Sequence, residues 1–156
     1  MKQYLPKWIF ASVAKHFDDR KQTVPLFVEG MLRQTNQVTN WAEFRLDGPY
    51  FTELSKNYHR VEIEVNVLIE SAANTTDAYI YLKNVGIFAK AFTKVIHVFR
   101  LGDAPEDDGT LVGCLYLKQE YREKLVISHF GESKPDQKQR QSQIEGHYEM
   151  FLDFVG

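Results

Sequence analysis

The sequence has 156 residues, of which 44% are hydrophobic and 26% are charged, and this size and composition suit one globular domain with its own core. The formal net charge of -2 argues against a protein that binds nucleic acid by neutralising its phosphates. The one cysteine, Cys114, excludes a disulfide within the chain and every zinc motif that needs several cysteines.

The N-terminal segment predicts a helix followed by a short strand. Pro6 suits the first turn of a helix, and apolar residues then recur at helical spacing as far as about Arg20. Val24–Val28 has the composition of a strand. Its Pro25 fits only a sheet edge or the start of a strand, because proline has no backbone N–H to donate.

A second strand and a turn are predicted next. Residues 30–40 are polar and indicate a loop, after which Trp41–Asp47 alternates apolar and polar residues as a half-buried strand does. Gly48 and Pro49 then predict a turn, because glycine tolerates a positive φ and proline fixes its own φ. We therefore expect an extended loop over residues 48–59.

Two long segments carry the clearest pattern in the chain. Arg60–Glu70 and Gln143–Phe154 alternate apolar and polar residues almost without interruption. Because successive side chains of a strand point to opposite faces, each segment predicts a strand with one dry and one wet side. The residues expected on the dry side are Val61, Ile63, Val65, Val67, Ile69, Ile144, Tyr148, Met150, Leu152 and Phe154. The wet side is mostly glutamate, which suits solvent, a hydrated channel or a basic partner.

A second helix is predicted between these strands. Residues 74–77 form a helix-start cluster whose Asn or Thr side chains can cap exposed backbone N–H groups. Apolar residues recur at three- and four-residue steps over Ala78–Phe92. Val95–Phe99 is rich in β-branched and aromatic residues, so we expect the helix to end near Phe92 and a strand to begin. A helix continued through Val95–Phe99 also satisfies the periodicity.

The C-terminal half predicts further strands separated by polar loops. An acidic hairpin loop at residues 102–109 leads into a strand over Thr110–Lys118. A strand over Lys124–Phe130 is expected to pair with it across residues 119–123. Residues 131–142 are polar and predict a mobile arm before the last long strand.

These elements predict a single α+β domain over residues 1–156, in which two helices pack on about six mainly antiparallel strands. Its extended loops are expected at residues 48–59, 102–109 and 131–142. No apolar run approaches the length that spans a bilayer, so we expect no membrane partner.

The acidic hairpin loop carries Asp103, Glu106, Asp107 and Asp108. A calcium loop of the EF-hand type needs a register of spaced ligands that is missing here, so a solvated turn is the default interpretation. In a ring of subunits, the same carboxylates could line a pore and repel DNA phosphates.

Three histidines lie on predicted strands: His97, His129 and His147. A metal site would need a carboxylate close by, and Glu145 or Glu149 could serve beside His147. No local motif supports this, and strand histidines with ordinary hydrogen bonds are far commoner. We therefore expect no metal and no cofactor.

Catalytic arrangements are equally weak. A nucleophilic pair of Cys114 and His129 is rejected, because nothing near the cysteine in sequence lowers its pKa. The carboxylates Glu62/Glu64 and Glu145/Glu149 each face one way on their strands, as acid–base catalysts do, but an exposed glutamate stripe looks the same. We expect a protein that is not an enzyme.

The polar arm carries Lys134, Lys138 and Arg140 against two acidic residues, which is too weak a charge for independent DNA binding. An arm that orders on a neighbouring subunit and a simply disordered segment are both compatible with this composition.

The segment Phe44–Tyr58, which reads FRLDGPYFTELSKNY, together with the strand after it resembles a group of small structural proteins from the virions of tailed bacteriophages. The layout of the whole chain is also similar to phage tail terminator proteins. The resemblance implies a ring, typically a hexamer, that caps the tail tube and joins it to the head connector. These families share no short invariant signature, so no functional residue is transferred from them.

From this resemblance we expect a non-enzymatic virion protein that is assembled in the host cytoplasm. Its expected partners are further copies of itself, the tail tube and the head connector. DNA is expected to pass without sequence-specific contact. Aromatic residues make up 13% of the chain, which suits contacts between proteins. Subunit contacts are expected from Tyr50, Phe51, Glu53, Lys134, Lys138 and Arg140, and an acidic channel lining from Asp103, Glu106, Asp107 and Asp108.

Two alternatives stay open at this point. Within the same class, the protein could be a tail tube subunit, a head-completion protein or another neck ring. From a different class, it could be a small-ligand-binding domain or a cone-shaped pocket enzyme, whose site would gather aromatic rings with His97, His129 and His147.

Overall fold

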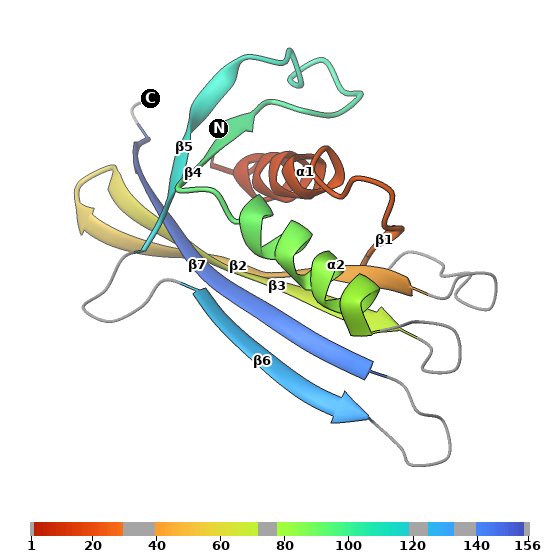
Figure 1. The fold of residues 1–156 in the computed structure, drawn as a ribbon. Coiled ribbons are helices and arrows are strands. Elements are labelled where there is room, and N and C mark those ends of the chain that lie inside the picture. Colours follow the sequence, from red (N-terminus) through yellow and green to blue (C-terminus); the bar gives the residue numbers. More distant parts are fainter. Residues whose placement is uncertain (1, 30–39, 72–77, 119–124, 133–139, 155–156) are drawn as a thin grey trace.

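The computed structural model of the protein describes residues 2–29, 40–71, 78–118, 125–132 and 140–154. These residues form two helices and seven strands (Figure 1). The helices are α1 (Leu5–Asp18) and α2 (Ala78–Ala91). The strands are β1 (Leu26–Val28), β2 (Asn40–Ser55), β3 (Tyr58–Ser71), β4 (Val95–Phe99), β5 (Leu111–Leu117), β6 (Leu125–Glu132) and β7 (Arg140–Asp153). The expected α+β class, with two helices on a mainly antiparallel sheet, is confirmed.

The strands form one curled sheet in the order β1-β2-β3-β7-β5-β4, with β6 paired to β7 off this path. β1 runs parallel to β2, and the other pairs are antiparallel. β7 pairs with β3 along its whole length. Its other edge is divided between β6, which reaches Gly146, and the end of β5, which pairs at Tyr148 and Glu149.

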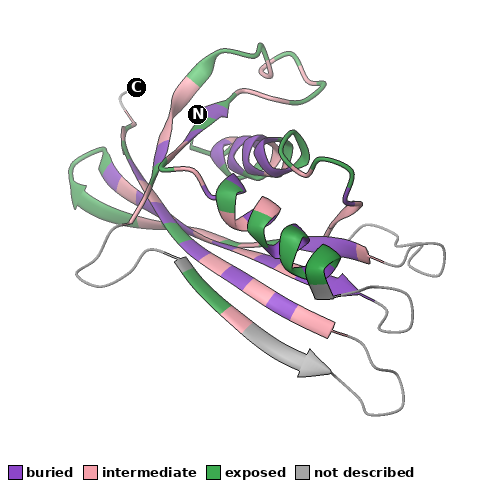
Figure 2. Ribbon diagram, viewed as in Figure 1, coloured by how far each residue is buried: buried purple, intermediate pink, exposed green. Residues whose placement is uncertain are grey.

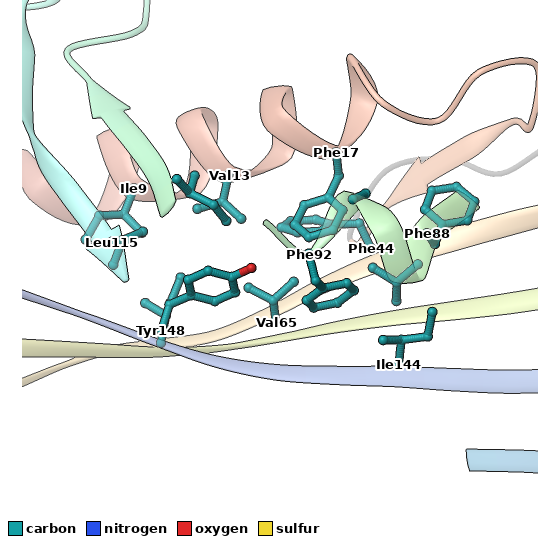
Figure 3. Close-up of a cluster of buried hydrophobic side chains, with 14 of the residues drawn as sticks. Ile9, Val13, Phe17, Phe44, Val65, Phe88, Phe92, Leu115, Ile144 and Tyr148 are labelled. Atoms are coloured by element: carbon teal, nitrogen blue, oxygen red, sulfur yellow. The ribbon is translucent and has the colours of Figure 1, made fainter. Parts of the chain in front are cut away.

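Both helices lie on the same side of the sheet, and the β4–β5 hairpin rises beside α1 (Figure 1). The core fills the space between the helices and the sheet (Figure 3). Phe17 of α1 contacts Phe44 of β2 and Phe92 after α2, with ring centroids 5.7 and 4.8 Å apart. Tyr148 of β7 is buried and donates its hydroxyl to the carbonyl of Thr93 at 2.8 Å.

The alternating segments behave as their pattern predicts. Val61, Ile63, Val65, Val67 and Ile69 of β3 are buried under the helices, and the residues between them are mostly half-exposed. Ile144, Tyr148 and Met150 of β7 are buried likewise, with Leu152 and Phe154 partly buried against the same core. Figure 2 shows the resulting alternation along both strands.

The predicted turn at Gly48–Pro49 and the predicted loop over residues 48–59 are wrong. β2 continues to Ser55 and turns at Lys56–Asn57 into β3, with a register shift between Asp47 and Tyr50. Gly48 has φ +105°, and a Cβ there would lie 2.9 Å from the carbonyl oxygen of Glu62. The glycine therefore lets a bulge form inside a continuing strand instead of ending it.

Two further expectations about the C-terminal half are corrected. β6 pairs with β7 and not with β5, because β7 leaves the edge along its first residues open to it. The predicted arm at residues 131–142 is shorter than expected, since β6 extends to Glu132 and β7 begins at Arg140. Residues 133–139 lie outside the described residues, as do residues 30–39 of the loop predicted at 30–40 and the helix-start cluster at 74–77. Asn40, the last residue of that predicted loop, begins β2.

The other boundaries agree with the sequence pattern. α1 begins next to Pro6, β1 follows Pro25 at the edge of the sheet, and residues 102–109 connect β4 and β5 as a hairpin loop. α2 ends at Ala91, and Val95–Phe99 is a strand, so the helix does not continue through it. Neither described helix is long and apolar enough to cross a membrane.

Candidate functional site

The face of the sheet that the helices leave uncovered is formed by the outward side chains of β2, β3 and β7, and we call it the acidic face. The strand register places these side chains in rows across the sheet, such as Asp47, Glu64 and His147. Its carboxylates are Glu43, Asp47, Glu62, Glu64, Glu70, Glu145 and Glu149. Its cations are fewer, chiefly Arg45, Arg60 and Lys118. The face therefore presents a negative surface.

At the centre of this face, Glu64, Glu145 and His147 converge. Glu64 lies directly opposite His147 in the β3–β7 register, and Glu145 precedes His147 by two residues on the same side of β7. One oxygen from each carboxylate and one ring nitrogen of His147 all lie within 4.8 Å of one another. Nε2 of His147 is 3.1 Å from Oε1 of Glu145. The side chains converge because pairing of antiparallel strands brings opposite residues together.

The electrostatics of this cluster are unfavourable for two ionised carboxylates. Partial burial is the largest cause that raises the pKa of Glu145, and the adjacent carboxyl of Glu64 raises it further. The Asn66 amide donates to Oε1 of Glu64 at 3.0 Å, which orients that carboxyl. Two carboxylates in contact must share a proton or bind a cation to relieve their repulsion.

A hollow of about 160 Å³ adjoins the cluster, lined by Tyr50, Glu62, Ile63, Glu64, Lys118 and His147. Lys118 donates to Glu62 at 2.9 Å, and this ion pair is the main cause that lowers the pKa of Glu62. Tyr50 donates its hydroxyl to Asp47 at 2.6 Å, which raises the pKa of the phenol. The hollow is thus walled by charged groups and open to solvent.

One corner of the acidic face is buried and hydrogen-bonded. Trp41 donates its indole N–H to Glu70, and Gln141 donates to the other oxygen of Glu70 at 2.7 Å. Arg45 lies 3.3 Å from the carboxylate of Glu43. These carboxylates are held by structural partners, so the accessible negative charge lies nearer the centre of the face.

The acidic hairpin loop, which we predicted to line a channel, is tied to α1. Asp107 accepts hydrogen bonds from the Trp8 indole at 2.6 Å and from Lys7 at 3.0 Å. Lys7 also donates to Glu106 at 3.0 Å. Asp108 accepts from the backbone and the hydroxyl of Thr110. Asp103 is exposed in the same loop. Most of this charge therefore fixes the loop, and the glutamates of β3 and β7 are better placed to face a partner.

The predicted subunit-contact residues do not share one surface. Tyr50 is exposed on the acidic face. Phe51 points to the helix side and packs against Phe154, with ring centroids 6.3 Å apart, and Glu53 is exposed near the hairpin turn. Arg140 begins β7 and lies near Tyr81; burial raises the pKa of this tyrosine, and Arg140 opposes the rise in part. Lys134 and Lys138 lie outside the described residues.

The histidines are also separated. His97 of β4 lies opposite Cys114 of β5, with Nδ1 3.2 Å from Sγ, whereas His147 lies on the acidic face. The side chain of His129 lies outside the described residues. Because His97 and His147 lie apart, they do not form the shared ligand pocket that the alternative interpretation requires. Sequence reasoning missed Glu64 beside His147 and His97 beside Cys114, because neither strand register is visible in a single sequence.

Exposed apolar side chains lie at the ends and edges of the sheet and also on α2, at Tyr79, Ile80 and Leu82. Tyr58 and Phe151 stack near the β2–β3 turn, with ring centroids 6.2 Å apart and planes 16° from parallel. On β6, Val126 is 52% and Ile127 is 43% exposed. Ile127 faces the helix side, opposite the buried Ile144, yet remains exposed.

The comparisons with known proteins find no family model that matches this chain and no curated protein that matches its sequence.

Proposed function

We propose that this protein is a non-enzymatic structural subunit of a tailed-phage virion, and within that class a tail terminator. It would form a ring that stops tail-tube growth and presents a surface to the head connector. The resemblance of Phe44–Tyr58 to small phage virion proteins supports the class. The α+β layout, with both helices on one face of a mainly antiparallel sheet, supports the terminator within it.

The observation that carries this proposal is the uncovered acidic face. DNA that passes through a ring needs a hydrated wall that does not bind its phosphates, and negative side chains repel them. Glu62, Glu64, Glu145 and Glu149 lie together on this face and are half-exposed. The opposite face is filled by the helices, so it is not available as a wall.

The edges of the sheet offer the unlike surfaces that a ring requires. Within the described residues, β6 hydrogen-bonds only to β7, so its outer edge is open, and β1 forms the opposite edge. Residues Leu125–Ile127 carry no charge, whereas natural edge strands are usually protected by charged residues. Contacts between two different edges generate a closed ring when the rotation per subunit closes.

The experiment uses the purified full chain, alone and with phage tail tubes. Light scattering and negative-stain microscopy should show a ring of fixed subunit number, and the protein should bind the end of the tube. Ile127→Lys should abolish the ring while the protein stays folded by circular dichroism. Leu82→Lys, at another exposed apolar position on α2, is the matched control and should leave the ring intact. A strict monomer that never binds virion components would defeat the proposal.

Other roles in the same class give different outcomes. Polymerisation of the pure protein into long tubes would assign it to the tail tube. Binding to the head connector without binding to the tube would assign it to head completion or to another neck ring.

A further inference from the structure

The cluster of Glu64, Glu145 and His147 is not explained by packing. The buried apolar residues of β3 and β7 lie on the opposite side of the sheet, and these three side chains face outward. Glu145 and His147 contact each other at 3.1 Å, and the carboxyl of Glu64 contacts Glu145. Such an arrangement holds two like charges together on a surface where each could turn toward water.

The donor set is that of a metal site with open positions. Carboxylate oxygens and an imidazole nitrogen bind first-row divalent ions at about 2.0–2.2 Å. An ion at those distances separates its donors by at most about 4.4 Å, and by about 3.4 Å in a tetrahedral site. The three donor atoms lie within 4.8 Å of one another. Side-chain adjustments on the order of 1 Å therefore bring all three onto one ion.

The surroundings of the cluster orient its ligands independently of any ion. Asn66 donates to Glu64 at 3.0 Å from the next outward position of β3, as residues behind metal ligands commonly do. β3 and β7 pair without interruption from Tyr58 to Ser71, so the backbone that carries the donors is rigid. The adjoining hollow of about 160 Å³, lined by Glu64 and His147, gives solvent and water ligands access to the same donors.

We propose that Glu64, Glu145 and His147 bind one divalent first-row transition-metal ion, with Zn²⁺ as the probe. Three protein ligands leave at least one position for water. The nitrogen donor selects such ions over Mg²⁺ and Ca²⁺, which prefer sets of oxygen ligands. This site stands on the geometry of one subunit and does not depend on ring formation.

Isothermal titration of the full chain with ZnCl₂ at neutral pH tests the site. One ion should bind, and Glu64→Gln and His147→Gln should each weaken binding by roughly tenfold or more. Glu149→Gln removes a carboxylate from the same face but outside the cluster, and it should leave the affinity unchanged. MgCl₂ should not compete at millimolar concentration. Absence of saturable binding, or equal binding by all these variants, would overturn the proposal.

The pair of Cys114 and His97 is the competing zinc site, because its sulfur and nitrogen lie 3.2 Å apart. Cys114→Ser should leave the zinc affinity unchanged. The Co²⁺ complex of the unmodified chain should show visible ligand-field bands without a thiolate charge-transfer band in the near ultraviolet. Loss of binding in Cys114→Ser, or a thiolate band, would place the ion on β4–β5 and refute the assignment to the acidic face.

Discussion

Trp8 of α1 donates its indole N–H to the carboxylate of Asp107, which lies in the β4–β5 loop, with Nε1 and Oδ1 2.6 Å apart. The same carboxylate accepts from the backbone N–H of Ala104 at 3.1 Å and from Lys7 at 3.0 Å. Its side chain is only 2% exposed. One carboxylate thus joins the first helix to a loop that starts more than eighty residues later, and it explains why the acidic loop takes a fixed shape.

Asp107→Ala should destabilise the protein clearly more than a substitution of its neighbour Glu106. The alanine leaves the Trp8 indole and the Ala104 N–H without their acceptor, and an unpaired donor that stays out of water is costly. Glu106→Gln removes only a more exposed ion pair with Lys7, and such pairs contribute little. Urea denaturation followed by tryptophan fluorescence measures both. Equal midpoints for the two variants would show that Asp107 is not an anchor.

His16 predicts a loss of stability in mildly acidic solution. Burial is the largest cause that lowers its pKa below the ordinary 6.5, and the contact with the carbonyl of Ala91 at 2.9 Å opposes this only in part. The unfolded chain therefore binds the proton more readily than the folded one. The contribution of neutral His16 to the free energy of unfolding is fully present above pH 6.5. It is lost as the pH falls toward the lower pKa that His16 has in the folded protein.

His16→Gln supplies the comparison, because glutamine keeps a donor for Ala91 but does not titrate. Urea midpoints measured at pH 7.5 and about pH 5.5 should differ more for the unmodified chain than for the variant. All other histidines are present in both proteins, so their effects cancel. An identical pH dependence in the two proteins would contradict the assignment.

The elements with a strong internal period were predictable from the sequence. β3, β7 and α2 each repeat apolar residues at the spacing of their own geometry, because each buries one side in the core between the helices and the sheet. The predicted end of the strand at Gly48 was wrong because glycine occurs both in turns and in β-bulges. Only the pairing of β2 with β3 shows that a bulge forms here. β6 was assigned to the wrong neighbour because strand pairing is not local in sequence.

The centre of the acidic face was only half predictable. Glu145 and His147 are two residues apart on one strand, so the period of two places them on one side. Glu64 lies on another strand, and although the alternation of β3 puts it on the same wet side, a shift of two residues in the β3–β7 register would have placed it opposite Glu145 or Glu149. The position of Glu64 opposite His147 depends on the register between β3 and β7, and the alternating pattern of one strand does not predict that register.

Phe17→Ala should be among the most destabilising single substitutions. The ring is fully buried and contacts Phe44 and Phe92, so its removal leaves a cavity between α1 and the sheet. The expected loss is about 3–5 kcal/mol in the free energy of unfolding. Phe10→Ala, on the same helix but 36% exposed, should cost clearly less. Denaturant titration of both variants tests this, and similar losses would mean that α1 is not anchored through Phe17.

Glu64→Gln should stabilise the metal-free protein, in contrast to the usual effect of changing a hydrogen-bonded residue. Its carboxyl group contacts that of Glu145, and like charges in contact across strands are destabilising. The measurement is a urea titration at pH 8 with a chelator, so that no divalent ion offsets the repulsion between the two carboxyl groups. Glu62→Gln is the matched control on the same strand, because Glu62 pairs with Lys118 at 2.9 Å and its loss should be neutral or slightly destabilising.

With zinc in place of the chelator, Glu64→Gln should instead be less stable than the unmodified chain. Glu64 then serves as a ligand, and its substitution removes the stabilisation that ion binding provides. A variant that is less stable than the unmodified chain under chelator would show that Glu64 and Glu145 do not repel each other.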